Sequence, residues 1–225
     1  MVSVTTALQQ RRSVRRYSPE PVPRAAVETM LSQARLAPSG ANLQPGFVRV
    51  LTGESLRHLS ERLCSAFEQG DSHPEEYSYF PSPMPDHLKA RQRAVGYALY
   101  ESLGIRRRDI AGRKAQHRRN FEFFNAPVGM VITIERDMGK GCYMDLGMFI
   151  QSLFLAATEQ GLGSCGIGAL ASYHPVIREV LDIPEDEVVV CGMALGYADP
   201  EAPENLFETE RLALTEFSRF SGFED

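Results

Sequence analysis

Four arginines and one serine lie close together near the start of the chain: Arg11, Arg12, Ser13, Arg15 and Arg16. A guanidinium can donate two parallel hydrogen bonds to a phosphate, and a serine hydroxyl adds a further donor. The cluster therefore indicates a binding site for the phosphate of a small molecule. On this segment alone three other interpretations stay open: a solvated helix end that complements the helix dipole, a nucleic-acid-binding patch, and a phosphorylation site.

A polar turn follows at residues 37–45, with the sequence Ala-Pro-Ser-Gly-Ala-Asn-Leu-Gln-Pro. The side-chain amides of Asn42 and Gln44 can both donate and accept hydrogen bonds. Such amides suit the edge of a heterocycle that carries carbonyl and N–H groups. An ordinary loop with capping side chains is the alternative.

A third candidate segment is the run Gly166, Ile167, Gly168. Because glycine has no side chain, the backbone N–H groups here can approach a flat ligand closely. A plain helix-to-strand turn is the alternative. The overlapping residues 161–166 match Gly-x-Gly-x-x-Gly, but they follow an expected helix, whereas a dinucleotide fingerprint follows a strand. We therefore interpret that match as accidental.

The rest of the sequence offers no group of side chains arranged for catalysis. The five histidines are scattered without metal-ligand spacing, so no metal site is predicted. Neither a Gly-x-Ser-x-Gly nucleophile elbow nor a phosphate-binding P-loop motif occurs. This pattern favours a bound cofactor that carries the chemistry itself.

The apolar pattern predicts a mixed α/β scaffold for these segments. Helical spacing of apolar residues, or a run of charged residues, predicts helices over residues 3–12, 88–103, 106–120 and 143–160. Another helix is expected between the prolines at 21 and 23 and the turn at 38–40, and a further one is marked by Leu56, Leu59 and Leu63. Apolar runs predict strands at residues 47–51, 127–135 and 187–197. Residues 70–86 contain four prolines and are expected to form a long loop. No linker divides the chain, so one domain of residues 1–225 is predicted.

Composition excludes several classes of protein. The 225 residues are 43% apolar and 24% charged, which is ordinary for a globular protein. The net charge of −5, with 29 acids against 24 bases, argues against nucleic acid as a partner. No apolar stretch is long enough to span a membrane, and the first ten residues lack a signal-peptide core, so a cytoplasmic protein is expected. Its four cysteines form no Cys-x-x-Cys pair and are expected to be buried free thiols.

The C-terminal segment is unusually apolar. Residues 205–225 carry large apolar side chains after the last expected strand, among them Phe207, Leu212, Leu214, Phe217, Phe220 and Phe223. Such side chains need a surface to cover them. A second subunit and the chain's own surface are both open as that surface.

Five segments, taken in order, resemble the FMN-dependent nitroreductase family, in particular its nitrobenzoate-reductase-like branch. They are residues 11–17, 37–45, 120–129, 144–170 and 191–211, and together they extend over nearly the whole chain. Two positions differ from the usual pattern. Gly46 follows Pro45 where the family often has Trp, and Gly166-Ile167 follow Cys165 where the branch often has Pro-Gln.

The resemblance implies an α+β fold, with a central, mostly antiparallel sheet flanked by helices, in an intertwined homodimer with FMN sites at the subunit interface. Residues 70–120 would form a variable region containing the substrate lid, with residues 70–86 and 106–119 as lid candidates. Residues 205–225 would form an arm that wraps the partner subunit.

The resemblance also implies the cofactor-binding residues. Arg11, Arg12 and Ser13 would lie at the FMN phosphate together with Arg211, and Arg15 near the pyrimidine edge of the ring. From the partner subunit, the flavin would be lined by Pro38, Ser39, Gly40, Asn42 and Gln44. Backbone donors toward flavin N5 and O4 would come from Gly166, Ile167, Gly168 and Ala169. No catalytic side chain and no metal are implied.

The implied activity is that of an FMN-dependent NAD(P)H oxidoreductase with a ping-pong mechanism. NADH or NADPH would reduce the flavin, and a nitroaromatic, a quinone or an activated alkene would then reoxidise it. The partners expected are the same chain and a small-molecule acceptor, with neither nucleic acid nor a membrane. Alternatives are dehydrogenase, oxidase or other non-nitro chemistry on the same fold, and a flavin-binding protein without turnover.

Overall fold

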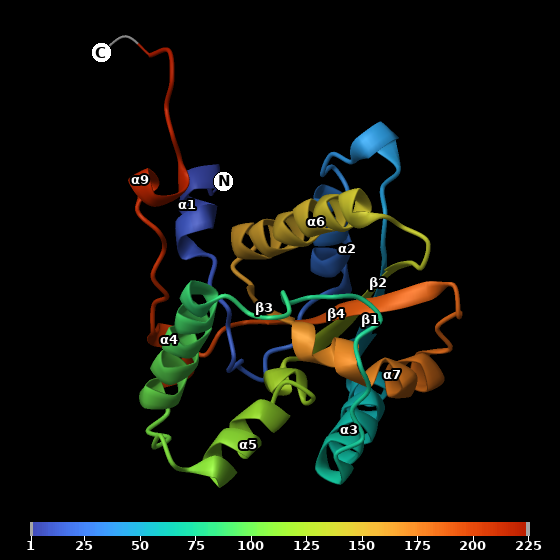
Figure 1. Cartoon of the computed structure of the whole chain (residues 1–225). Helices are drawn as coiled ribbons and strands as arrows, with labels where there is room; N and C mark the ends of the chain where they lie inside the picture. The colour runs from blue at the N-terminus through green and yellow to red at the C-terminus, as the bar shows by residue number, and fades with distance from the viewer. Residues whose placement is uncertain (1, 224–225) are drawn as a thin grey trace.

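The computed structural model describes residues 2–223 and is built around one antiparallel sheet (Figure 1). Its strand order is β1-β2-β4-β3, and each neighbouring pair is antiparallel. The strands are β1 Phe47–Thr52, β2 Val128–Glu135, β3 Gly163–Ile167 and β4 Glu187–Gly196. The α+β class with a mostly antiparallel sheet, expected from the sequence, is confirmed.

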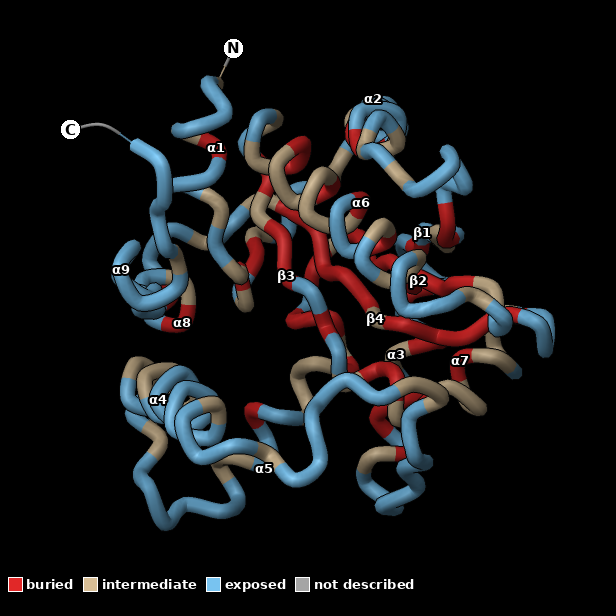
Figure 2. The backbone as a smooth tube through the Cα atoms, turned by 45° about the horizontal axis from the view of Figure 1, so that its top comes forward, coloured by how far each residue is buried: buried red, intermediate tan, exposed pale blue. Residues whose placement is uncertain are grey.

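Helices cover both faces of this sheet, because the central strands β2 and β4 are apolar on both sides. Along β2, Met130, Ile132 and Ile134 pack into the core on one face, while Val131 packs into the core on the other. The first face is covered by α2 and α6, and the second by α3 and α7 (Figure 1). Figure 2 shows these strands as the most deeply buried part of the chain, in contrast to the exposed α4 and α5.

The helices predicted from apolar spacing or charge are all present, within a few residues of their expected limits. The α-helices are α1 Val4–Gln10, α2 Arg24–Ala34, α3 Gly53–Gln69, α4 Asp86–Ser102, α5 Ile110–Arg118, α6 Lys140–Glu159, α7 His174–Leu181, α8 Pro203–Leu206 and α9 Leu214–Phe217. Three short 3-10 turns are η1 Gly40–Asn42, η2 Phe123–Asn125 and η3 Gly168–Tyr173.

The elements α7, α8, α9 and β3 were not predicted from the sequence. The sequence of β3 is Gly-Ser-Cys-Gly-Ile, which has low intrinsic strand propensity and forms a strand by pairing with β4. The Gly-x-Gly-x-x-Gly match runs from the end of α6 into β3, so a helix precedes it and a strand contains its end. This is the reverse of the dinucleotide-binding order, as expected.

The helix α6 is buried along one face only. Leu146, Phe149 and Leu153 are buried against the sheet and α2, whereas Met144 is 70% exposed and Met148 is 40% exposed. The sequence of residues 143–160 is apolar on nearly every side, which predicts a place in the core or at a subunit contact. For this outer face, the subunit contact stays a prediction.

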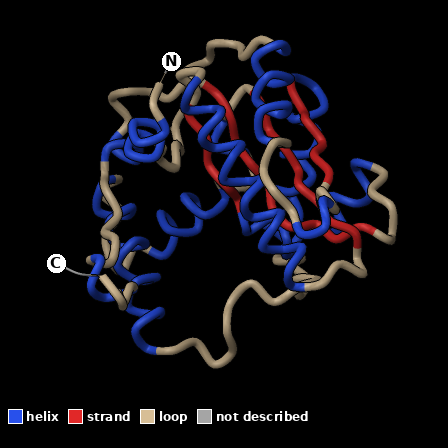
Figure 3. The backbone as a smooth tube through the Cα atoms, turned by 90° about the horizontal axis from the view of Figure 1, so that it is seen from above, coloured by secondary structure: helices blue, strands red, loops and turns tan. Residues whose placement is uncertain are grey.

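The C-terminal segment lies away from the sheet (Figure 3). Phe217, Phe220 and Phe223 are exposed, so over this stretch the chain does not bury its own aromatic side chains. Coverage by a second subunit stays a prediction, and residues 224–225 of the expected arm lie outside the described residues.

Two smaller expectations concern cysteines and membranes. All four cysteines are free, but only Cys64 and Cys165 are buried, while Cys142 and Cys191 are partly exposed. Among the described residues, none of the helices combines the length and the apolar character needed to cross a bilayer. A cytoplasmic location stays a prediction.

Candidate functional site

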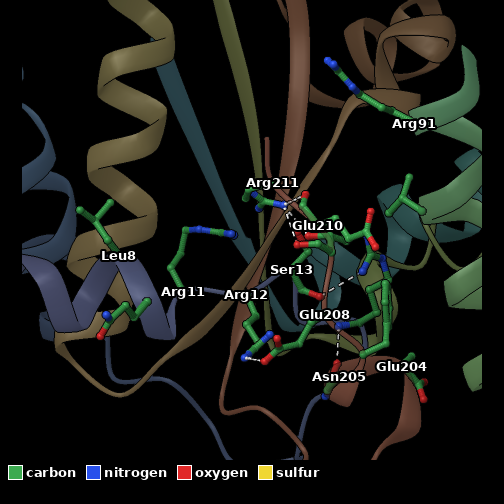
Figure 4. Close-up of a pocket in the computed structure, with 15 residues that line it drawn as sticks. Leu8, Arg11, Arg12, Ser13, Arg91, Glu204, Asn205, Glu208, Glu210 and Arg211 are labelled. Atoms are coloured by element: carbon green, nitrogen blue, oxygen red, sulfur yellow. Dashed lines mark hydrogen bonds and ion pairs between the residues drawn. The ribbon is translucent and has the colours of Figure 1, made fainter. Parts of the chain in front are cut away.

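A groove of about 620 Å³ lies where the segment after α1 meets the segment after α8 (Figure 4). The five sequence-predicted residues that line it are Arg11, Arg12, Ser13, Arg15 and Arg211. The sheet holds the segment that carries the first four of these residues. Ser13 forms a parallel bridge with Ser164 of β3, and the Val14 N–H donates to the Ser164 carbonyl at 2.9 Å. The two ends of the chain therefore meet at one cavity.

The groove concentrates positive charge that the chain does not fully neutralise. Arg12 pairs with Glu208 at 2.6 Å, whereas Arg11 has no ion-pair partner within residues 2–223. Figure 4 shows the Arg11 side chain extending toward Arg211, which donates hydrogen bonds to Thr209 and to the Glu210 carbonyl of its own segment. Burial, and then the charge of Arg211, lower the pKa of Arg11. Two facing guanidinium groups beside the Ser13 hydroxyl are the donor set that a phosphate requires.

The backbone at Arg15 is clamped by residues from distant parts of the chain. The Arg15 N–H donates to Asn205 Oδ1 at 2.7 Å, and Asn205 Nδ2 donates to the Arg16 carbonyl at 2.8 Å. Arg119 donates to the Arg15 carbonyl at 2.8 Å and to Glu204 Oε1 at 2.7 Å. Glu204 is only 2% exposed, so its carboxylate lies buried between Arg119 and Arg16. These contacts fix the direction from which Arg15 enters the groove.

The sequence analysis did not identify this clamp. Asn205 and Glu204 lie within the segment 191–211 that carried the family resemblance, but no local pattern relates them to Arg15. Arg119 was grouped with the lid candidate 106–119, whereas the structure bonds it to the backbone of the groove. In the sequence, Arg119 is one more arginine at the C-terminal end of an expected charged helix. Nothing in that position indicates which residue its side chain contacts.

The glycine segment lies at the C-terminal end of β3. It lies just beyond Ser164, the residue of β3 that pairs with Ser13 of the groove. Gly166 and Gly168 are exposed, whereas Cys165 and Ile167 on either side of Gly166 are buried. Ala169, just beyond, is half-buried. The glycines thus open a strip of backbone to a ligand, as the sequence analysis expected for a close approach.

Two cavities border this strip. One, of about 530 Å³, is lined by Gly168, Ala169 and aromatic residues including Tyr79 and Tyr173. The other, of about 390 Å³, is lined by Gly166, Ile167 and Gly168 together with Tyr77, Tyr143 and Phe154. A methyl group added at Gly166 would approach Phe154 Cζ at 3.2 Å, and one at Gly168 would lie 3.8 Å from Tyr79 Cε2. The strip therefore faces walls that contain aromatic rings, with Phe154 and Tyr79 nearest to the two glycines.

The loop 70–86 supplies part of those walls, as do residues of α5. Tyr77, Tyr79 and Phe80 come from the loop, and His117 comes from α5. Both lid candidates thus border the cavities beside Gly168. Their movement as lids stays a prediction.

The predicted turn 38–44 lies elsewhere in the chain, between α2 and β1. A hydrogen bond joins this turn to α6, where Asp145 Oδ2 accepts from the Gly40 N–H at 3.0 Å. Pro38, Ser39, Gly40, Asn42 and Gln44 line neither the arginine groove nor the two cavities at Gly168. The resemblance assigned these five residues to the site of the partner subunit, and that assignment stays a prediction.

This turn is strained, as functional segments often are. Ala41, Asn42 and Gln44 have φ angles of 49°, 58° and 51°, in the left-handed region that side-chain-bearing residues seldom adopt. Gly46 has a φ of 95°, and a Cβ there would lie 2.5 Å from Leu146 Cδ1. This contact explains why glycine stands where the family often has a larger residue.

Residues 8–197 match the Nitroreductase family. The chain belongs to the nitroreductase family. It is 36% identical over 214 residues to the nitrobenzene nitroreductase of Ectopseudomonas oleovorans, covering 95% of this chain and 94% of that protein. It is also 36% identical to the 4-nitrobenzoate reductase of Pseudomonas putida, covering 95% of this chain and 93% of that protein.

Solved structures of nitroreductases superpose on this family member closely. The crystal structure of the FMN and NADPH-dependent nitroreductase NfnB from Sphingopyxis sp. strain HMH gives a TM-score of 0.95 with 38% sequence identity, covering 98% of this chain and all of that one. The FMN-dependent nitroreductase NfnB from Mycobacterium smegmatis, in complex with NADPH, gives a TM-score of 0.91 with 28% identity and the same coverage. The family resemblance read from the sequence is confirmed.

Proposed function

We propose that this nitroreductase is an FMN-dependent NAD(P)H oxidoreductase that reduces nitroaromatic compounds. The observation that carries the proposal is the groove at which Arg11, Ser13 and Arg211 meet, adjacent to the exposed backbone of Gly166 and Gly168. A phosphate site next to a flat, glycine-lined surface suits a flavin mononucleotide. The names of the related proteins support both the cofactor and the substrate class.

Each part of the site has a task in this proposal. Arg11, Ser13 and Arg211 hold the phosphate, and Arg12 adds positive charge while bonded to Glu208. Arg15, fixed by its backbone clamp, places a cation beside the carbonyl-rich edge of the ring and stabilises negative charge there. When bound, FMN supplies electron transfer between the nicotinamide and the acceptor, so no side-chain nucleophile is needed.

The glycine strip serves the other edge of the ring. The backbone N–H groups of residues 166–169, Gly168 above all, donate toward N5 and O4 of the flavin. A side chain at Gly168 would narrow the space between this backbone and Tyr79, where its Cβ would lie 3.8 Å from Cε2. The glycine therefore keeps the backbone accessible to a planar ring.

The complete site, in this proposal, is formed by a homodimer. The strained turn with Ser39, Asn42 and Gln44 would complete the flavin site of the partner subunit, and the segment from residue 205 would wrap the partner. The support is the exposed apolar surface of the tail at Phe217 and Phe220, together with Met144 on the outer face of α6.

Spectroscopy of the purified protein tests the proposal. We expect a yellow protein with an FMN-like spectrum, whose colour bleaches on anaerobic addition of NADPH or NADH and returns on addition of nitrobenzene. Titrating the two nicotinamides separately identifies the preferred donor. A protein that stays colourless after incubation with FMN contradicts the cofactor. Flavin that NAD(P)H does not bleach supports a binding protein without turnover, and bleached flavin that no nitroaromatic reoxidises supports the other chemistries of this fold.

A further inference from the structure

The cavities beside Gly168 differ sharply from the arginine groove in charge. The 390 Å³ cavity is lined by no charged side chain. The 530 Å³ cavity is lined by one carboxylate, that of Glu75, and by no lysine or arginine. His117 also lines this cavity and could carry a positive charge if it were protonated. Its ring packs against Phe67 and Phe121, with centroid distances of 5.5 and 5.7 Å. This burial lowers the pKa of His117, so its imidazole is neutral near pH 7.

Glu75 is held at the cavity by its neighbours on the loop 70–86. The Ser172 hydroxyl donates to Glu75 Oε1 at 3.2 Å, and the His73 N–H donates to the Ser172 carbonyl at 2.8 Å. On the other side of Glu75, the Tyr77 hydroxyl donates to the Val190 carbonyl at 2.8 Å. These contacts hold the loop on both sides of Glu75, while the carboxylate itself is exposed and receives one hydrogen bond, from Ser172.

The cations that approach this loop are bound to Glu76 and not to Glu75. Arg136 and Arg178 bind the carboxylate of Glu76 at 2.6 and 3.2 Å, and His174 lies 3.6 Å from it. Glu75 itself has no ion-pair partner in the part of the chain that the structure describes. The net charge at the cavity is therefore negative.

We propose that the acceptor site of this nitroreductase selects uncharged nitroaromatics over carboxylated ones, and that Glu75 is the residue responsible. The inference rests on the proposed function, and it names the substrate class within it. Sequence similarity does not decide between the two classes, because a nitrobenzene nitroreductase and a 4-nitrobenzoate reductase are each 36% identical to this chain. The charge of the cavity does decide.

The expected effect follows from the size of the cavity. A volume of about 530 Å³ corresponds to a sphere about 10 Å across, so an acceptor inside it lies within about that distance of Glu75. This is comparable to the Debye length of about 10 Å at 0.1 M salt, so salt screens the repulsion only in part. With an effective dielectric constant of about 20 to 40, the repulsion of two carboxylates at this distance lowers kcat/KM about tenfold.

The test compares 4-nitrobenzoate with 4-nitrobenzamide, which have nearly the same shape and differ in charge. With NADPH as donor, we expect the ratio of kcat/KM for the amide to that for the acid to be at least about tenfold in the wild type. In Glu75→Gln, which retains an acceptor for the Ser172 hydroxyl, that ratio should fall several-fold. Raising ionic strength should lower the ratio in the wild type and leave it unchanged in Glu75→Gln.

The matched control is Glu61→Gln, which removes one exposed carboxylate from the outer surface of α3. Its amide-to-acid ratio should equal that of the wild type. If both compounds are reduced and the ratio in Glu75→Gln equals that in Glu61→Gln, the role of Glu75 is refuted while the proposed function stands. If neither compound is reduced with NADPH or with NADH, the proposed function fails, and this inference fails with it.

Discussion

Asn205 offers the most direct test of how the fold positions the flavin site. Asn205→Ala removes three hydrogen bonds: the one from the Arg15 N–H at 2.7 Å and those to the carbonyls of Arg16 and Asp199 at 2.8 and 2.9 Å. Each such bond contributes about 1 kcal/mol net. Because Asn205 is half-buried and water can replace part of the loss, we expect the free energy of unfolding to fall by about 2 kcal/mol.

The effect on FMN distinguishes positioning from stability alone. Without Asn205, the Arg15 N–H and the Arg16 carbonyl lose their partner, and the bonds from Ser164 and Arg119 that remain hold the direction of the Arg15 guanidinium less firmly. Loss of one such charged contact corresponds to about a tenfold rise in the FMN dissociation constant. We also expect a lower flavin midpoint potential, because a displaced Arg15 stabilises negative charge on the reduced ring less well.

Fluorescence titration with FMN, a spectroelectrochemical potential and urea unfolding measure these three effects. The control is Asn120→Ala, which removes a local hydrogen bond to the His117 carbonyl at 2.7 Å and touches no residue of the groove. It should change unfolding slightly and leave FMN affinity and the potential unchanged. An Asn205→Ala protein that is destabilised but binds FMN with wild-type affinity and potential would refute the positioning argument.

Three further predictions concern the groove, the sheet and the tail. Arg211→Ala should weaken FMN binding by about 1.5–3 kcal/mol, as one charged hydrogen-bonding partner is lost, and an unchanged dissociation constant would remove Arg211 from the site. Hydrogen bonds from Arg49, and next from Thr133, hold the pKa of Glu187 below its ordinary value. The ionised carboxylate therefore stabilises the fold above about pH 4.3, the pKa of an unfolded glutamate, and this stabilisation is lost as the pH falls through the lowered pKa of the folded state. Glu187→Gln should cost about 2 kcal/mol at pH 7 and flatten the acid limb of a urea-denaturation series, and an unaltered acid limb would contradict this. Deleting residues 214–225, which spares the groove, should give a monomer or an aggregate in sedimentation velocity, and an intact, active dimer would show that the tail has another role.

The sequence predicted those elements whose own residues carry a strong pattern. The long apolar runs predict β2 and β4, and the periodic spacing of apolar residues predicts α3 and α6. These patterns lie within each segment, so no contact with a distant residue has to be known. By contrast, the glycines and serine of β3 become a strand only through β4.

The site divides in the same way. Arg11 and Ser13 could be proposed from a local motif, and Arg211 from the family resemblance. The clamp joins Arg15 to Asn205, which lies 190 positions later, and no local pattern records such a contact. The left-handed backbone conformation of Asn42 and Gln44 could not be predicted from the sequence either, since neither residue type requires it.

The meeting of Arg11 and Arg211 at one groove has a consequence for the whole chain. An anion held by both acts as a non-covalent cross-link between the two ends, with almost all of the fold enclosed between them. A ligand present at a hundred times its dissociation constant adds about 2.7 kcal/mol to the stability of the form that binds it. Most of that gain secures the C-terminal segment, whose own contacts are few. The supply of flavin would in this way govern how long newly made copies survive proteolysis, before any substrate is met.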